Sequence, residues 1–118
     1  MIHFEPREFF CKCGKCDLGF EQMDRAFLEK IERARGLCDR PWIITSAIRC
    51  PEHNRAVGGS PTSSHLAGHA VDVACAYGPQ RLEIVQAVMG VGIFRIGLAS
   101  NFIHLDDDEN KPDSIWLY

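Results

Sequence analysis

The sequence has no long hydrophobic run, no excess of basic residues and no low-complexity segment. No stretch approaches the roughly 20 apolar residues that span a bilayer, and residues 1–16 lack the apolar core of a secretion signal. We therefore expect a chain that is made in the cytoplasm and does not bind a membrane. Its 13 basic and 16 acidic residues give a formal net charge of -3, which excludes a general electrostatic attraction to nucleic acid.

The length and composition of the chain fit one folded domain and leave no room for two. The 118 residues are 46% hydrophobic and 25% charged, values typical of a globular domain with a buried core. A domain of this size buries roughly two thirds of the surface of its unfolded chain, so it needs no cross-links to fold. We expect a single domain over residues 1–118 that acts as a monomer, with a cysteine-rich segment at residues 11–16.

Hydrophobic spacing predicts two helices and a set of short strands. Apolar residues recur at helical spacing in residues 21–35. A second helix begins near Pro79, and its predicted apolar face is formed by Leu82, Val85, Val88 and Met89. Residues rich in β-branched and aromatic side chains predict strands at 42–48, 70–74, 93–99, 102–106 and 115–118. This order favours an α+β domain whose central sheet is mainly antiparallel and flanked by helices.

Five histidines are spread along the chain, and two of them are four residues apart. His65 and His69 would lie on one side of a helix and could bind one zinc ion there. However, the glutamate of an H-E-x-x-H helix is absent, and Gly68 together with the β-prone residues 70–74 argues against a helix at this position. We therefore expect an extended segment, with His65 in the loop before it.

Alternation along two predicted strands places a histidine and two acids on polar faces. Asp72 lies opposite the apolar face of one strand, and His104 and Asp106 share one face of the other. His65 in its loop can fold back over Asp72. Together, His65, Asp72 and His104 would provide two nitrogens and one oxygen, a set that suits zinc with a fourth position left to water. The alternative is that Asp72 caps a turn or pairs with an arginine, since a buried carboxylate needs a compensating partner.

Four sequence blocks carry a resemblance to a known enzyme family. Residues 63–72 read S-x-H-x-x-G-x-A-x-D. This pattern resembles the signature of the zinc D-Ala-D-Ala carboxypeptidase superfamily, which also contains phage cell-wall endopeptidases, vancomycin-resistance dipeptidases and the hedgehog amino-terminal domain. Its small phage-type members have further blocks that resemble, in the same order, SAIRCPEHN at 46–54, AVGG at 56–59 and FIHLD at 102–106. The resemblance covers nearly the whole chain.

The resemblance implies a zinc peptidase with a hedgehog-like fold. It implies a catalytic zinc ion held by His65, Asp72 and His104, and an oxyanion stabilised by Arg49, whose alternative role is that of a surface residue at a strand end. Ser63 and Arg49 would contact the substrate. The expected reaction is hydrolysis of a peptide bond in a peptidoglycan stem peptide or cross-link by a water that zinc activates. A phage or prophage enzyme of this kind needs no signal of its own, because a lysis system releases it to the cell wall.

The general base is the part of the family pattern that this sequence does not match. Relatives often carry a glutamate three residues before the last zinc histidine, or a histidine two residues before it, and here these positions are Asn101 and Phe102. Neither side chain can accept a proton from water. We predict Asp106 as the base because it shares the face of His104; its alternative role is to orient a zinc-binding histidine. Weaker candidates for the base are Glu52, His53 and Glu109.

Three of the six cysteines lie within one short segment. Cys11, Cys13 and Cys16 could contribute three thiolates to a second, structural metal site, which Cys50 or Cys38 would complete. Only the spacing from Cys13 to Cys16 has the C-x-x-C form of a zinc ribbon. Disulfides, unmodified thiols and a cysteine nucleophile paired with a histidine are the alternatives.

Two other functions stay open on the sequence alone. A non-catalytic zinc module that binds wall peptide or a protein partner would explain the unmatched base position. A small metal-thiolate or redox protein would make the cysteines the functional residues, but it leaves the four ordered blocks unexplained. Zinc content separates this metal-thiolate or redox protein from the zinc peptidase and from the non-catalytic zinc module.

Overall fold

A five-stranded sheet with the order β1-β2-β4-β3-β5 runs through the molecule. The computed structural model describes residues 1–118. Neighbouring strands pair antiparallel except at one edge, where β5 runs parallel to β3. The strands are β1 (Ile44–Ser46), β2 (Ala70–Ala74), β3 (Arg95–Leu98), β4 (Phe102–Asp106) and β5 (Ser114–Leu117). The predicted α+β class with a mainly antiparallel sheet is therefore confirmed.

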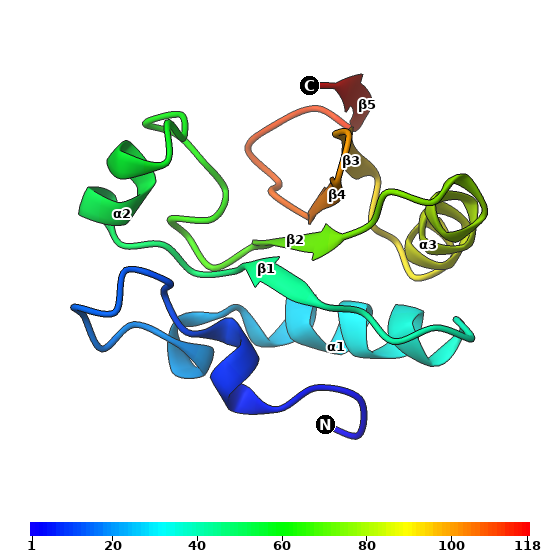
Figure 1. The fold of residues 1–118 in the computed structure, drawn as a ribbon, viewed down its shortest axis with the longest axis horizontal. Helices are drawn as coiled ribbons and strands as arrows, with labels where there is room; N and C mark the ends of the chain where they lie inside the picture. The colour runs from blue at the N-terminus through cyan, green and yellow to red at the C-terminus, as the bar shows by residue number, and fades with distance from the viewer.

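Helices flank this sheet on both sides. They are α1 (Arg25–Gly36), α2 (Pro51–Ala56) and α3 (Gly78–Gly90), and two short 3₁₀ helices, η1 (Pro6–Phe9) and η2 (Phe20–Gln22), precede α1. In Figure 1, α1 and the N-terminal segment lie along one side of the sheet, and α2 lies on the other side. α3 contacts α1 at the end of the molecule far from α2. No helix has the length and apolar character needed to cross a membrane.

The hydrophobic core fills the space between the sheet and α1. Alternation along β2 and β4 sends their apolar side chains to this side, as predicted. The fully buried residues that meet there include Phe9, Phe27, Ile31, Val71, Val73, Ile103 and Leu105. Because one face of the central strands is committed to this core, the side chains between these residues must point to the opposite face.

The structure differs from the predicted helices in two respects. α1 begins at Arg25, because the side chain of Asp24 accepts a hydrogen bond from the Phe27 backbone N–H at 2.9 Å and so caps the helix there. In α3, Leu82 and Met89 are 59% and 45% exposed, so the predicted apolar face was wrong for these two residues. The buried residues of α3 are Ile84, Ala87 and Val88. The predicted face and the buried face of α3 both carry apolar residues, so their spacing alone did not determine which face packs against the core.

Candidate functional site

The antiparallel register of β2 and β4 brings the predicted histidine–aspartate group together. Asp72 of β2 lies directly opposite His104 of β4, and His104 Nδ1 is 3.0 Å from Asp72 Oδ1. His65 comes from the loop between α2 and β2, and its Nε2 is 3.2 Å from the same carboxylate oxygen. One ligand atom from each residue lies within 4.8 Å of the others, and all three side chains are buried. We call these three residues the histidine–aspartate group.

The ring nitrogen that points away from Asp72 is anchored in both histidines. His65 Nδ1 is 2.7 Å from the carbonyl oxygen of Ala47, which can only accept, so Nδ1 carries a proton and Nε2 is the nitrogen that faces Asp72. His104 Nε2 is 2.6 Å from Asp106 Oδ2, which leaves Nδ1 to face Asp72. Metal-binding histidines are held in this way, by a carbonyl or carboxylate on the far nitrogen. The donor set and its supports therefore fit a divalent metal such as zinc.

The charges of this group favour an ionised carboxylate. Burial alone would raise the pKa of Asp72, but hydrogen bonds from His104 and His65 hold it well below its ordinary range. Burial likewise acts to lower the pKa of His104, yet the hydrogen bonds to Asp106 and Asp72 raise it above the ordinary value. A proton on His104 therefore competes with a metal ion for the same nitrogen.

Arg49 lies against the second oxygen of Asp72. Its Nη2 is 3.3 Å from Asp72 Oδ2, and its Nε donates to Ser46 Oγ at 3.0 Å. A further hydrogen bond joins its Nη1 to Asn54 Oδ1 at 3.2 Å. The side chain is 13% exposed, so Arg49 is a fixed cation at the site and not a free surface residue. The predicted pairing of Asp72 with an arginine thus exists alongside its contacts with the two histidines.

The contacts of Asp106 favour the orienting role over the role of base. Its side chain is 1% exposed, and Oδ2 accepts from the His104 ring. Oδ1 accepts from Arg95 Nε at 2.7 Å and from the Asp108 backbone N–H at 3.0 Å. Burial alone would raise the pKa of Asp106, but these hydrogen bonds, led by that from His104, lower it. Both oxygens are occupied, so neither is free to receive a proton from water.

Two residues that contribute to the site, Arg95 and Trp116, were not predicted from the sequence. Trp116 is opposite Gly97 in the β3–β5 pairing, and a Cβ at Gly97 would lie 2.6 Å from the indole nitrogen. The indole therefore lies over β3, 5.4 Å from the His104 ring, with the Arg95 guanidinium 4.9 Å from it. Pairing residues 93–99 with 102–106 would have placed Arg95 beside Asp106. The contact with Trp116 depends on a parallel strand that sequence spacing does not reveal.

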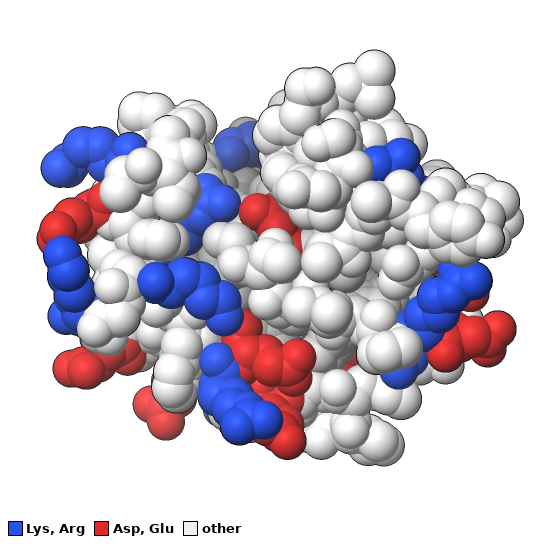
Figure 2. Space-filling model, in the orientation of Figure 1, with Lys and Arg blue, Asp and Glu red and all other residues white.

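A pocket of about 470 Å³ opens onto the histidine–aspartate group. It is lined by all three of its residues and, among others, by Arg49, Ser63, Arg95, Phe102, Trp116 and Tyr118. Figure 2 shows a hollow between the surface over α2 and the surface over β5, with acidic atoms inside it and basic atoms beside it. A second hollow of about 760 Å³ is larger, but it contains none of the three residues and has few hydrophobic ones. The smaller pocket therefore marks the candidate site.

The remaining predicted residues divide into those at this pocket and those away from it. Ser63 lines it, although its Oγ accepts a hydrogen bond from the His65 backbone N–H at 3.2 Å. His69 is elsewhere, where its Nδ1 is 2.8 Å from Asp107 Oδ1. The three weaker candidates for the base do not line the pocket: Glu52, His53 and Glu109.

The cysteines also divide into two sets. The sulfur atoms of four of them lie within 4.8 Å of one another, and we call these the cysteine cluster: Cys11, Cys13, Cys16 and Cys50. Of the two predicted partners for the N-terminal cysteines, Cys50 lies in the cluster and Cys38 lies in the core. All six cysteines are free thiols.

Comparison with known families gives one match. The family model described as Peptidase M15 matches residues 2–106. This range contains the histidine–aspartate group, Arg49 and Asp106, and it ends before β5 with Trp116. A comparison with curated proteins found no match.

Proposed function

The chain belongs to the peptidase M15 family, and from this premise we propose that it is a zinc metallopeptidase that hydrolyses peptide bonds in bacterial peptidoglycan. The observation that carries the proposal is the convergence of one oxygen and two nitrogens, each histidine with its far ring nitrogen anchored. Burying the polar carboxylate and imidazole groups that this anchoring requires costs free energy, which apolar side chains at these positions would not. The buried carboxylate and imidazoles are accounted for if they bind a metal.

The histidine–aspartate group would hold the zinc ion through His65 Nε2, Asp72 Oδ1 and His104 Nδ1. When bound, zinc would polarise the scissile carbonyl and lower the pKa of water to about 7. A set of three protein ligands leaves room for a further ligand, which distinguishes catalytic zinc sites from structural ones. The pocket gives that side of the group access to solvent and substrate.

Arg49 would stabilise negative charge on the carbonyl oxygen of the substrate. Its guanidinium is held at three points, by Ser46, Asn54 and Asp72, so little reorganisation is needed when the charge develops. The neighbouring Ser63 hydroxyl can donate to a substrate carbonyl while its oxygen accepts from the His65 backbone. These two residues are the proposed contacts to the polar part of the substrate.

Asp106 would act as a positioning residue. By accepting a hydrogen bond from His104 Nε2–H, it would leave Nδ1, the atom that faces Asp72, as the nitrogen that offers its lone pair to a metal ion. Arg95 holds Asp106 in turn and stacks on Trp116. A chain of contacts therefore runs from β5 through Arg95 and Asp106 to the proposed zinc ligand.

Aromatic rings give the pocket an apolar wall. Phe102 and Tyr118 are 5.1 Å apart between ring centroids, and Trp116 stands beside Tyr118 at 6.5 Å. An apolar wall next to fixed cations suits a peptide with small side chains and a carboxylate near the cleaved bond. We infer that the substrate is a D-alanine-containing stem peptide or cross-link. Release of the chain to the cell wall by a phage lysis system stays a prediction.

Digestion of purified peptidoglycan tests this function. Wild-type protein loaded with zinc should release new peptide ends, detected by mass spectrometry, and a His65→Ala, His104→Ala variant should release none. His69→Gln is the matched control, because His69 is a partly buried histidine outside the pocket, and it should retain the activity. Hydrolysis at the wild-type rate by the double variant would refute the proposal.

A non-catalytic zinc module is the second candidate, and the occupied oxygens of Asp106 favour it. The only carboxylates that line the pocket are Asp72 and Asp106, and both are bonded on each oxygen. A module of this kind would sediment with peptidoglycan in a zinc-dependent manner without releasing peptide ends. Cleavage by the zinc-loaded wild type would exclude this candidate.

A further inference from the structure

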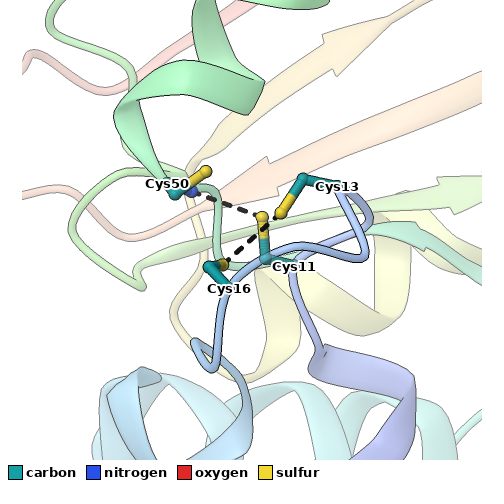
Figure 3. A group of neighbouring side chains, drawn as sticks. All are labelled: Cys11, Cys13, Cys16 and Cys50. Carbon is teal, nitrogen blue, oxygen red and sulfur yellow. Dashed lines mark hydrogen bonds between the residues drawn. The ribbon is translucent and has the colours of Figure 1, made fainter.

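Four cysteines from two distant parts of the chain meet on the side of the molecule between the N-terminal segment and α2. Figure 3 shows Cys11, Cys13 and Cys16 on one loop and Cys50 at the start of α2, with their sulfur atoms turned toward a common space. Gly14, at φ +69°, supplies the left-handed residue of the turn that returns Cys16 toward Cys13. The loop is closed by a hydrogen bond from the Cys11 N–H to the carbonyl of Leu18 at 2.9 Å.

The spacing of the sulfur atoms is close to that of a tetrahedral metal site. All four lie within 4.8 Å of one another, and Cys13 Sγ is 3.5 Å from Cys16 Sγ. With zinc–sulfur distances of about 2.3 Å, the sulfurs of a tetrahedral site are about 3.8 Å apart. The cluster therefore needs only small side-chain adjustments to surround one ion. A disulfide needs about 2.05 Å between sulfurs, and no pair in the cluster is bonded.

Backbone N–H groups point at three of the four sulfurs. The Lys15 N–H donates to Cys13 Sγ at 3.2 Å, and the His53 N–H donates to Cys50 Sγ at 3.3 Å. The Cys50 N–H donates to Cys11 Sγ at 3.4 Å and so links the two parts of the cluster. A neutral thiol is a weak acceptor, whereas a thiolate accepts strongly. Donors arranged in this way stabilise the thiolates that ligate a metal.

We propose that the cysteine cluster binds a second zinc ion, which is structural. Four thiolates fill all positions of a tetrahedral ion, so no position is left for water or substrate. Each thiol that binds releases its proton to solvent as the sulfur–zinc bond forms. The exposed position of Cys16 allows the ion to enter from solvent. This proposal does not depend on the function of the histidine–aspartate group.

The structural ion would cross-link the N-terminal segment to the part of the chain beside the candidate active site. Cys50 directly follows Arg49, and the Arg49 N–H donates to the carbonyl of His65 at 3.2 Å. An ion at the cluster therefore fixes the backbone from which the Arg49 side chain extends. The N-terminal segment has only short 3₁₀ helices of its own, so such a cross-link adds stability that local structure does not supply.

Zinc and iron content per chain, measured by elemental analysis after purification under reducing conditions, tests the proposal. The full-length Cys16→Ser variant should contain one zinc ion fewer than the wild type. The matched controls are the two cysteines outside the cluster, and Cys38→Ala and Cys75→Ala should keep the wild-type zinc content. The His65→Ala, His104→Ala variant should keep the cluster's zinc, whatever becomes of the other site. Equal zinc in Cys16→Ser and wild type, or iron in place of zinc, would overturn the proposal.

Cobalt(II) chloride provides a second measurement that does not require any cysteine variant to fold. Added to metal-free, reduced His65→Ala, His104→Ala protein, cobalt should give the intense near-ultraviolet absorption of thiolate-to-metal charge transfer. Zinc sulfate should then abolish this absorption. Because the histidine site is removed in this protein, failure of the proposed peptidase function leaves the result unchanged. Absence of the charge-transfer band from the folded variant would refute the cysteine site.

Discussion

Replacement of Asp106 by asparagine tests how the site controls His104. Asp106 Oδ1 faces two donors, Arg95 Nε and the Asp108 N–H, so the single amide oxygen of asparagine must remain on that side. The amide NH₂ group then faces His104 Nε2, which must accept instead of donate. The ring proton moves to Nδ1, the atom that faces Asp72 Oδ1 at 3.0 Å. In this tautomer Nδ1 has no lone pair for a metal ion.

The expected loss of zinc affinity follows from the role of Asp106 as a carboxylate that supports a metal-binding histidine. Removal of such a partner lowers metal affinity by about 10- to 100-fold, equivalent to about 1.4–2.8 kcal/mol. Zinc affinity is measured by competition with a chromophoric chelator, using protein whose cysteine cluster is already saturated. Asp107→Asn is the matched control: it makes the same charge change one residue away, where the carboxylate contacts His69 and Lys30.

The reasoning fails if the two variants bind zinc equally well. It also fails in an informative way if Asp106→Asn keeps wild-type zinc affinity and loses only hydrolysis, because that result would make Asp106 the general base. A loss of affinity that is recovered at higher zinc concentration, with hydrolysis restored, is the result expected of a positioning residue.

Further predictions concern a cation, a buried turn and a titrating histidine. Arg49→Lys should keep zinc and lower kcat by about 100-fold or more in peptidoglycan digestion, because one ammonium cannot replace the three-point guanidinium. Gly68→Ala should cost at least about 2 kcal/mol in urea unfolding, since its φ is +75° and its Cβ would strike the backbone of η2; Gly58→Ala, at the same φ in open space, should cost about 1 kcal/mol. Burial acts to lower the pKa of His69, but the hydrogen bond to Asp107 raises it overall. This contact therefore stabilises the fold fully when the pH is below the pKa that His69 has in the unfolded chain. The stabilisation disappears as the pH rises through the pKa that His69 has in the folded protein. Wild type should therefore exceed His69→Gln in stability by up to about 1 kcal/mol at about pH 5 and by less at about pH 8.

Much of the candidate site was predictable because strand alternation is a strict rule. Once residues 70–74 and 102–106 are strands with apolar core faces, Asp72 and His104 must lie on the same opposite face. His65 was predicted as the third member because its loop can fold back over Asp72, and the family resemblance supported a position that spacing alone could not fix. The structure brings these three residues together.

Features that depend on packing or on distant strand pairing could not be predicted. The face of α3 was ambiguous because apolar residues lie all around this helix. The approach of Trp116 to His104 requires β5 to pair parallel with β3, which no local signal indicates. The choice of Cys50 over Cys38 also required the fold, since sequence separation does not tell which cysteine the N-terminal loop reaches.

The most direct test of the account is anomalous diffraction at the zinc absorption edge from crystals of the zinc-loaded wild-type protein. The account predicts a peak in direct contact with His65 Nε2, Asp72 Oδ1 and His104 Nδ1, at the floor of the pocket that Arg49 and Trp116 line. A crystal with saturating zinc and no peak between these three atoms would contradict it.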